Sequence, residues 1–399
     1  MRTVNIGVIG HGARGEGMLK NLLDIGGVSV RWVCDLYEDR VEKGIKTVTA
    51  AGLPAPKGTQ DYHDILKDGE VEAVFIFSAW ESHVPIAVDA MEAGKATAME
   101  VGGAYTVDDC WRLVRTYEKT KTPFMLLENC CYGKRETMVL NMVRKGLFGQ
   151  IVHCRGGYLH DLREEVAFGK ENRHYRLRNY LRRNCENYPT HELGPIAKVL
   201  NINRGNRMLT LHSVASKAAG LKEYIKEKKS DDAELMNATF AQGDIITTTI
   251  TCADGATILL TLDTTLPRSY SRGFTVQGTK GMFSEESDSV YIDGVSEHFW
   301  EPDKTWGTAK NFEEHLAPVW KDEGTAAKGG HGGIDHLELA DFLDRVRSGE
   351  PMPIDVYDAA AWMVITPLSE DSIATGATVP IPDFTCGAYT TREALDVLI

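Results

Sequence analysis

Val4-Asn5-Ile6-Gly7-Val8-Ile9-Gly10-His11-Gly12-Ala13-Arg14-Gly15 is the stretch that decides the fold of this chain. An apolar strand runs directly into the pattern G-x-G-x-x-G. The first glycine permits a tight turn, the second lets a pyrophosphate approach the backbone, and the third lets a helix pack on the strand. The helix start then offers unpaired N–H groups to phosphates. The stretch predicts a dinucleotide-binding turn made by Gly10, Gly12, Ala13, Arg14 and Gly15.

An acidic residue follows at the spacing that such a turn requires. A second apolar stretch, Val28 to Cys34, ends at Asp35. An acid about 20 positions after the glycines holds the ribose hydroxyls of the dinucleotide, and its charge repels a 2′-phosphate. We therefore expect NAD rather than NADP. The alternative is a glycine-rich turn that binds nothing, with Asp35 an ordinary residue at a strand end.

Length, charge and cysteine content narrow the class of protein. A chain of 399 residues suggests two domains, and its hydrophobic fraction of 43% is ample for buried cores. The net charge of −13 argues against nucleic acid or an anionic membrane as a partner. The sequence has no run of about 20 apolar residues, so no membrane span is expected. The eight cysteines, with no signal-like segment before the first strand, favour reduced thiols and a cytoplasmic location.

Two patterns of elements divide the chain. Strands and helices alternate over the first 125 residues, which predicts a doubly wound parallel sheet, a Rossmann fold, in residues 1–126. Residues 127–399 carry β-branched and alternating stretches that predict an α/β domain with a large mixed or antiparallel open-faced sheet. We expect its strands at Ile151–Tyr158, Met208–Ala215, Ile245–Cys252, Thr257–Leu262 and Gly273–Gln277, a hairpin over 282–293, helices at 336–348 and 356–374, and a solvated face or mobile loop at 222–232.

Polar residues follow the fifth and sixth strands of the predicted parallel sheet. Glu100 ends the fifth strand and Asn129 comes just after the sixth. The carboxyl ends of such strands face the cofactor crevice, so both residues are candidates there. Glu100 could instead be a capping or surface acid. Cys130 and Cys131 are expected to pack in the core, because adjacent cysteines point in different directions and make a poor metal pair. No metal site is expected.

Candidate proton-transfer groups lie in the second half of the chain. Alternation along a strand puts Tyr158 and His160 on one face. Tyr188 and His191 lie in a turned loop before a helix at 196–200, with Thr190 as its expected cap. A phenol and an imidazole are suited to proton transfer, although both could simply satisfy loop carbonyls.

Three further segments could contact a ligand. The stretch from 173 to 183, which includes Arg176, carries five arginines and is either a solvated face or a rim that binds an anion or a sugar. The loop around Tyr270 is polar and could touch a sugar. Four glycines surround His331, which permits close approach of the backbone to a ligand. A zinc site at His331 and His336 is poorly supported by their spacing.

The chain resembles the Gfo/Idh/MocA oxidoreductase superfamily and, within it, glycoside hydrolase family 109, typified by α-N-acetylgalactosaminidases. This architecture implies a Rossmann domain and an α/β domain whose sheet often forms an oligomer contact, so a homo-oligomer is expected. The resemblance runs through essentially the whole chain and rests on Leu127-Glu128-Asn129-Cys130-Cys131-Tyr132-Gly133, Tyr158-Leu159-His160-Asp161-Leu162-Arg163, Tyr188-Pro189-Thr190-His191, Asn201-Ile202-Asn203-Arg204-Gly205, Tyr270-Ser271-Arg272, Gln277-Gly278-Thr279-Lys280-Gly281, Gly329-Gly330-His331-Gly332-Gly333 and Asp355-Val356-Tyr357-Asp358-Ala359-Ala360-Ala361-Trp362.

Two departures from related patterns concern chemistry. Dehydrogenases of the superfamily usually carry Glu-Lys-Pro where this chain has Glu100-Val101-Gly102, so the lysine often used in their proton chemistry is missing. Family 109 tends to have Glu-Val-Pro there. The family also tends to have His-Gly-Leu-Gly-Pro where this chain has His191-Glu192-Leu193-Gly194-Pro195. Glu192 adds a carboxylate beside the proposed base, and the sugar pocket is expected to differ.

The resemblance implies an NAD-dependent glycoside hydrolase acting on a small-molecule glycoside. Its reaction would be transient C3 oxidation, C2 deprotonation, elimination of the C1 aglycone, water addition and re-reduction. The alternatives are a net NAD-dependent sugar 3-dehydrogenase and a non-catalytic NAD-binding sensor. The implied roles are proton transfer for His191, Tyr188, Tyr158 and His160, substrate contact for Tyr270, His331, Arg176 and Glu192, and contact with the nicotinamide ribose for Glu100 and Asn129.

Overall fold

The computed structural model describes residues 2–297 and 300–397. They form two compact units, and each is described by itself. The first unit contains residues 2–133 and 318–360, and the second contains residues 134–317 and 361–397. The predicted domain boundary between residues 126 and 127 stays a prediction, but the segment 318–360 packs with the N-terminal residues.

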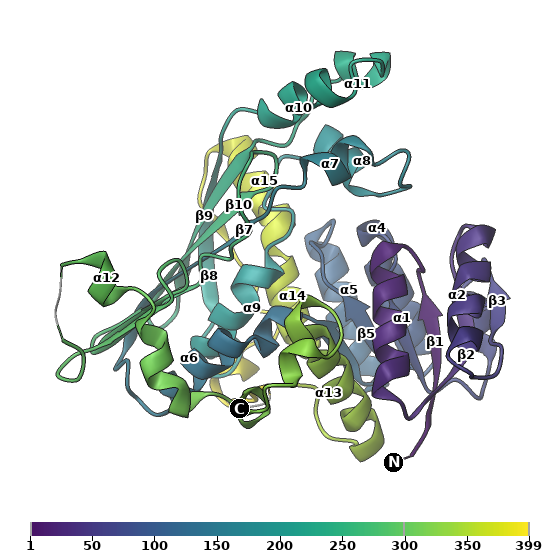
Figure 1. The fold of residues 1–399 in the computed structure, drawn as a ribbon, viewed down its shortest axis with the longest axis horizontal. Coiled ribbons are helices and arrows are strands. Elements are labelled where there is room, and N and C mark those ends of the chain that lie inside the picture. The colour runs from purple at the N-terminus through teal and green to yellow at the C-terminus, as the bar shows by residue number, and fades with distance from the viewer. Residues whose placement is uncertain (1, 298–299, 398–399) are drawn as a thin grey trace. The chain divides into compact units, whose positions relative to one another are not determined.

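The first unit is built on a six-stranded sheet in which every neighbouring pair is parallel (Figure 1). The strand order is β3-β2-β1-β4-β5-β6, the order of a Rossmann fold. This confirms the predicted doubly wound sheet. The strands are β1 (Val4–Ile9), β2 (Val28–Cys34), β3 (Lys57–Thr59), β4 (Ala73–Ile76), β5 (Ala96–Glu100) and β6 (Phe124–Leu127), and the main helices between them are α1 (Ala13–Ile25), α2 (Glu38–Ala50), α3 (His63–Lys67), α4 (Trp80–Glu92) and α5 (Val107–Thr120).

A segment from late in the chain completes this unit. It contains the short helices η3 (Pro318–Lys321), η4 (Thr325–Ala327) and η5 (His331–Gly333), followed by α13 (Ile334–Ser348). Trp320 Nε1 donates to the carbonyl of Tyr132 at 3.0 Å. The rings of Phe342 and Phe75 pack edge to face with centroids 5.2 Å apart. Helix α13 lies beside α1 in Figure 1. The late segment is therefore part of the core of the first unit.

The second unit is built on an eight-stranded mixed sheet in the order β13-β12-β11-β7-β10-β9-β8-β14. Strands β7 and β10 are parallel, whereas the other neighbours are antiparallel. Along β9, Ile246 and Ile250 are buried while Thr249 and Thr251 are exposed, as the predicted open-faced sheet requires. The strands are β7 (Ile151–Leu159), β8 (Met208–Ala215), β9 (Ile245–Cys252), β10 (Thr257–Asp263), β11 (Thr275–Gly278), β12 (Gly281–Ser284), β13 (Ser289–Ile292) and β14 (Val379–Pro380).

Helices cover the buried face of this sheet. Helix α9 (Thr190–Val199) packs on β7 so closely that a Cβ at Gly156 would lie 2.8 Å from Glu192 Cβ. Helix α15 (Ile365–Thr375) packs on β8, where Ser213 N donates to Ser372 Oγ at 2.9 Å. The unit also contains α6 (Lys134–Arg144), α7 (Arg163–Ala167), α8 (Arg176–Arg182), α10 (Gly220–Lys228), α11 (Ala233–Asn237) and α12 (Pro302–Thr305). Helix α14 (Val356–Met363) precedes α15, and the chain passes from the first unit to the second within it.

The structure corrects several predicted elements. Helix α9 starts at Thr190, six residues before the predicted start, and Pro189 is its N-cap. The Thr190 hydroxyl makes no hydrogen bond within the described residues, so its predicted capping role is wrong. The charged segment at 222–232 lies largely in α10 and is mostly exposed, so the predicted solvated face is confirmed and the alternative of a mobile loop is wrong. The single helix predicted at 356–374 is two helices, α14 and α15.

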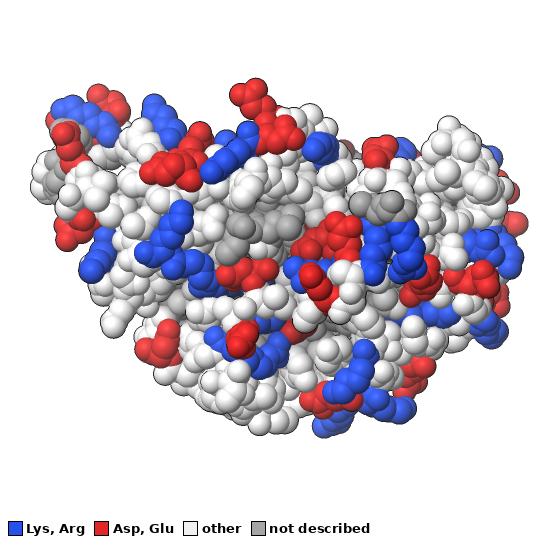
Figure 2. Space-filling view, turned by 90° about the horizontal axis from the view of Figure 1, so that it is seen from below, with Lys and Arg blue, Asp and Glu red and all other residues white. Residues whose placement is uncertain are grey.

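Charge is mixed rather than concentrated on the face of the molecule that Figure 2 shows. Acidic and basic side chains are interspersed over the face in Figure 2. Across the ranges that the structure describes, no helix is both long enough and apolar enough to cross a bilayer. All eight cysteines are free thiols, and only Cys386 is exposed.

Candidate functional site

The glycine-rich turn of the first unit leaves no room for a side chain at Gly10 or Gly15. Gly10 has a φ of +92°, and a Cβ there would lie 2.6 Å from the carbonyl carbon of Phe77. A Cβ at Gly15 would lie 2.1 Å from the Gly10 oxygen, which shows how closely α1 packs on the end of β1. Gly12 is the N-cap of α1 and makes no side-chain cap. The bare backbone at the start of α1 fits the pyrophosphate of a dinucleotide.

Asp35 lies at the end of β2, beside this turn, and is 8% exposed. Its Oδ2 accepts from the His11 backbone N–H at 2.7 Å, and its Oδ1 accepts from the Tyr37 N–H at 3.0 Å. Each oxygen of an ionised carboxylate can accept a second hydrogen bond. The two backbone donors hold the carboxylate in one orientation, so both oxygens can accept from vicinal ribose hydroxyls.

Arg14 contacts the predicted cofactor residue Glu100 directly and is joined to Asn129 and His331 through Asp335, a carboxylate that the sequence analysis did not single out. Its Nε donates to Glu100 Oε1 at 2.5 Å, and its Nη1 donates to Asp335 Oδ2 at 2.7 Å. Asn129 Nδ2 donates to the other oxygen of Asp335 at 2.7 Å. His331 Nδ1 lies 2.7 Å from Asp335 Oδ2. Arg14, Glu100, Asn129 and His331 are therefore neighbours, with Asp335 at their centre.

The pKa values of two buried carboxyls in this cluster are shifted in opposite directions. Burial opposes ionisation of Asp335, but hydrogen bonds and charge from His331 and Arg14 prevail and lower its pKa. Glu338, one turn further along α13, is fully buried 3.7 Å from Arg14. Its burial and the neighbouring charge of Asp335 raise the pKa of Glu338. Asp335 is thus the ionised partner of Arg14.

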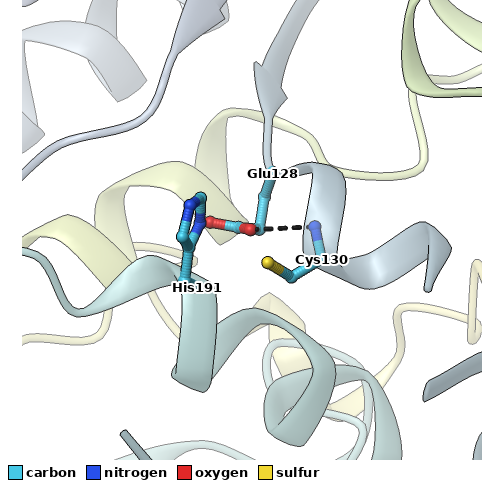
Figure 3. A group of neighbouring side chains, drawn as sticks. All are labelled: Glu128, Cys130 and His191. Carbon is cyan, nitrogen blue, oxygen red and sulfur yellow. Dashed lines mark hydrogen bonds between the residues drawn. The ribbon is translucent and has the colours of Figure 1, made fainter. Parts of the chain in front are cut away.

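A short turn after β6 carries Asn129 into position. Glu128 Oε1 accepts from the Cys130 backbone N–H at 3.1 Å, the dashed contact in Figure 3, and so caps η1 (Asn129–Tyr132). Cys130 and Cys131 are 2% and 3% exposed, which confirms that they pack in the core. The capped turn carries Asn129, whose Nδ2 donates to Asp335.

The second unit gathers five rings from three segments. Tyr158 from β7 lies against Tyr188, with ring centroids 4.5 Å apart, and against His191, with centroids 5.4 Å apart. Tyr188 and His191 are themselves 4.8 Å apart. The Tyr158 hydroxyl lies 3.2 Å from His160 Nδ1. The ring of His160 in turn lies 5.0 Å from that of Tyr270. We call Tyr158, His160, Tyr188, His191 and Tyr270 the ring cluster.

Backbone pairing brings the third segment to the ring cluster. Leu159 at the end of β7 and Ser271 exchange two hydrogen bonds, N–H to carbonyl in each direction, at 3.2 and 3.0 Å. This places Tyr270 beside His160, with 52% of Tyr270 exposed. Tyr158 and Tyr188 are much less accessible, at 6% and 8%. The cluster is therefore open at its Tyr270 side.

One arginine of the predicted rim belongs to the ring cluster. The guanidinium of Arg176 lies 4.8 Å from the Tyr188 ring centroid, and its Nε is 2.6 Å from Glu165 Oε1. Burial, followed by the positive charge of Arg176, lowers the pKa of His160. His160 is therefore neutral at pH 7 and can accept a proton. Arg183, in the same segment, pairs instead with Glu370.

The loop that carries Tyr188 is held from two sides. Gln242 Nε2 donates to the Cys185 carbonyl at 2.9 Å, and its Oε1 accepts from Asn187 Nδ2 at 3.1 Å. Glu186 N donates to Ser369 Oγ at 2.8 Å. Burial raises the pKa of the Glu186 carboxyl to about 8, against the opposing hydrogen bond from the Tyr188 N–H. The loop therefore contains a buried carboxyl, that of Glu186, which is neutral at pH 7.

Two of the predicted substrate residues lie outside the ring cluster as described. His331 belongs to the first unit, beside Arg14. Glu192 is 2% exposed and its Cβ faces Gly156 on β7. Asp335 and Glu165 were the residues that sequence analysis missed. Asp335 lies four positions after His331, a spacing that pairs side chains at a helix start, and this signal could have found it.

Comparison with known families agrees with both halves of the structure. The model described as glycosyl hydrolase 109, C-terminal domain, matches residues 132–391. The model described as oxidoreductase family, NAD-binding Rossmann fold, matches residues 4–127.

Individual relatives span nearly the whole chain. A glycosyl hydrolase family 109 protein of Stenotrophomonas maltophilia is 40% identical over 99% of this chain and 92% of its own length. An α-N-acetylgalactosaminidase of Tannerella forsythia is 39% identical over 98% of this chain and 88% of its own. These identities extend through both units.

Solved structures share the fold. Levoglucosan dehydrogenase in complex with NADH and L-sorbose has a TM-score of 0.69 at 18% identity, covering 96% of this chain and 100% of that one. Myo-inositol 2-dehydrogenase from Lactobacillus plantarum has a TM-score of 0.68 at 15% identity, with the same coverage. The N-terminal match, the C-terminal match and the full-length relatives together show that this chain belongs to glycoside hydrolase family 109, with an NAD-binding Rossmann domain of the Gfo/Idh/MocA type.

Proposed function

We propose that the chain is an NAD-dependent glycoside hydrolase in which the ring cluster handles the protons of the sugar. The observation that carries this is the neutral His160 bonded to the Tyr158 hydroxyl. The carboxylates whose charges act on His160, Asp161 and Glu165, are each ion-paired with an arginine. Hydrolysis by direct displacement needs two carboxyl groups available at the glycosidic bond. Because these two described carboxylates are engaged with arginines, the relay of Tyr158 and His160 favours the NAD-dependent route.

The first unit supports the cofactor part of the proposal. The bare turn from Gly10 to Gly15 and the fixed carboxylate of Asp35 fit the pyrophosphate and a ribose of NAD. Bound NAD would supply a reversible hydride acceptor, so that the reaction has no net redox change. Val101, which is 3% exposed, is the apolar residue where superfamily dehydrogenases carry lysine, so protons must be moved by other groups.

The ring cluster offers those groups. His160 accepts a proton in its neutral form, and the Tyr158 hydroxyl can pass one to it along their 3.2 Å contact. Tyr188 and His191 provide a second phenol and imidazole within the same cluster, for the C3 hydroxyl or the C2 proton. Arg176 stabilises negative charge that develops on the phenols or on the sugar. The substrate we propose is a small glycoside, and the relative from Tannerella forsythia makes an α-N-acetylgalactosaminide the first to test.

A panel of nitrophenyl α- and β-glycosides tests the proposal directly. The protein should release nitrophenol when NAD⁺ is present and lose this activity when stripped of NAD⁺. Solvent deuterium should appear at C2 of the product, because C2 is deprotonated and reprotonated. Accumulation of NADH without release of nitrophenol would instead favour the sugar dehydrogenase. Retention of hydrogen at C2 would favour direct displacement.

Substitution of His191 should remove turnover but leave cofactor binding intact. A positioned acid or base contributes about 10²- to 10⁴-fold to rate, so His191→Ala should lower kcat by at least that range. The dissociation constant for NAD⁺, measured by calorimetry, should not change. His212→Ala on β8, outside the ring cluster, is the matched control. Wild-type turnover in His191→Ala contradicts the assigned role.

The pH dependence of kcat/KM should show that the positive charge of Arg176 lowers the pKa of His160. The proton-accepting form of His160 is neutral, so activity should fall as the pH drops through its pKa, which is below the ordinary value of about 6.5. Arg176→Gln removes a positive charge, raises the pKa of His160 and moves this acid limb to higher pH. The exposed Arg178, on the same helix, provides the control Arg178→Gln. An acid limb of kcat/KM that stays in place in Arg176→Gln rules out His160 as the titrating group.

Asp35 should decide between the two dinucleotides. The carboxylate that holds ribose hydroxyls repels a 2′-phosphate, so the wild type should bind NAD⁺ more tightly than NADP⁺. Asp35→Ala should weaken NAD⁺ binding on the order of 10- to 100-fold, the effect of losing hydrogen bonds to a charged group, and narrow the gap to NADP⁺. Glu38→Ala, an exposed acid at the start of α2, should bind like the wild type. If Asp35→Ala keeps the wild-type ratio of affinities for NAD⁺ and NADP⁺, another residue discriminates between the two dinucleotides.

A further inference from the structure

One buried carboxylate joins three segments around the glycine-rich turn. Asp335, in the first turn of α13, is 1% exposed. Its Oδ1 accepts from Arg14 Nη2 at 3.1 Å and from Asn129 Nδ2 at 2.7 Å. Its Oδ2 accepts from Arg14 Nη1 at 2.7 Å and lies 2.7 Å from His331 Nδ1. The partners come from α1, from the turn after β6 and from the glycine-rich segment 329–333.

The local backbone is built for this arrangement. A Cβ at Gly330 would lie 2.5 Å from Asp335 Oδ2, so a side chain there would displace the carboxylate. Gly333, the N-cap of α13, has a φ of +95°, and its Cβ would lie 2.3 Å from the Thr325 oxygen. The backbone of His331 also has a positive φ, +51°. These glycines let the segment turn back so that His331 and Asp335 meet.

Removing the charge of Asp335 would change the geometry of all three partners. Arg14 would keep its contact with Glu100, but its two Nη donors would lose their main acceptor. Asn129 and His331 would each lose their contact with this carboxylate. A neutral amide in the same place offers one acceptor oxygen instead of two. The three side chains would then lose the common acceptor that fixes their orientations.

We propose that Asp335 is a positioning residue for the bound dinucleotide, which it serves by orienting Arg14, Asn129 and His331 toward the NAD site. The inference rests on the proposed function, because it takes NAD as the ligand of the Gly10–Gly15 turn. It goes beyond that function by assigning residues 329–335 of the late segment to retention of the cofactor. A hydrolase that returns its NAD to the starting state in each cycle gains from slow release.

Binding measurements on purified protein test this assignment without using activity. Asp335→Asn should weaken NAD⁺ binding about 10- to 100-fold, the range typical of residues that hold ligand-binding side chains in place, and should speed NAD⁺ dissociation. Asp322→Asn is the matched control. Asp322 lies in the same late segment, is exposed and pairs with Lys328 at 3.5 Å. The control should bind NAD⁺ like the wild type.

A double-mutant cycle separates positioning from a general structural role. If Asp335 acts through Arg14, the loss of affinity in Asp335→Asn with Arg14→Gln should be smaller than the product of the two separate losses. Losses that simply multiply would overturn the proposal. Wild-type affinity in Asp335→Asn would overturn it while leaving the proposed function in place. Failure of the wild type to bind any NAD⁺ would overturn both.

A second variant serves if Asp335→Asn does not fold. The His331 side chain is 63% exposed, so His331→Gln removes one partner without opening the core. It should increase the NAD⁺ dissociation rate while the thermal unfolding curve stays that of the wild type. An unchanged dissociation rate in this variant would overturn the role of the late segment.

Discussion

Helix α1 approaches strand β1 so closely that no side chain fits between Gly15 and the carbonyl of Gly10, and the first unit depends on this contact. Because α1 is held there, its first turn offers bare backbone to a phosphate, and Arg14 is carried toward Glu100 and Asp335. The same turn places the His11 N–H against Asp35. One steric constraint therefore sets the positions of both the anion-binding backbone and the two charged groups beside it.

The second unit reaches its geometry by different means. The pleat of β7 sets Tyr158 and His160 side by side, and the early start of α9 brings His191 to the same rings. Two of its ionisable groups are neutral at pH 7. Burial and the charge of Arg176 lower the pKa of His160, and burial raises the pKa of Glu186. A site made of phenols and imidazoles, with His160 neutral, can move protons in a reaction whose hydride chemistry is supplied by a cofactor.

Features that follow from local sequence patterns were predicted, whereas contacts between residues far apart in the sequence were not. The glycine turn, the strands at 28–34 and 208–215, and the shared face of Tyr158 and His160 follow from spacings of a few residues. The predicted start of α9 at residue 196 is six residues too late, and Pro195, just before that predicted start, lies inside the helix. The contact of Arg14 with Asp335 joins residues 321 positions apart, and no local periodicity reports such a pair. No local pattern predicts that Arg176 lies over the Tyr188 ring either, because the fold of the chain between them brings the two together.

The discontinuous course of the first unit bears on how the protein forms during synthesis. Residues 2–133 leave the ribosome long before residues 318–360, so an emerging N-terminal fragment contains all strands of its parallel sheet but lacks the helix that carries the acceptor of Arg14. Contacts of such long sequence separation form late and slowly. The nascent half-unit must remain soluble with that flank uncovered while the intervening unit is translated, which is the stage at which chaperones would matter most.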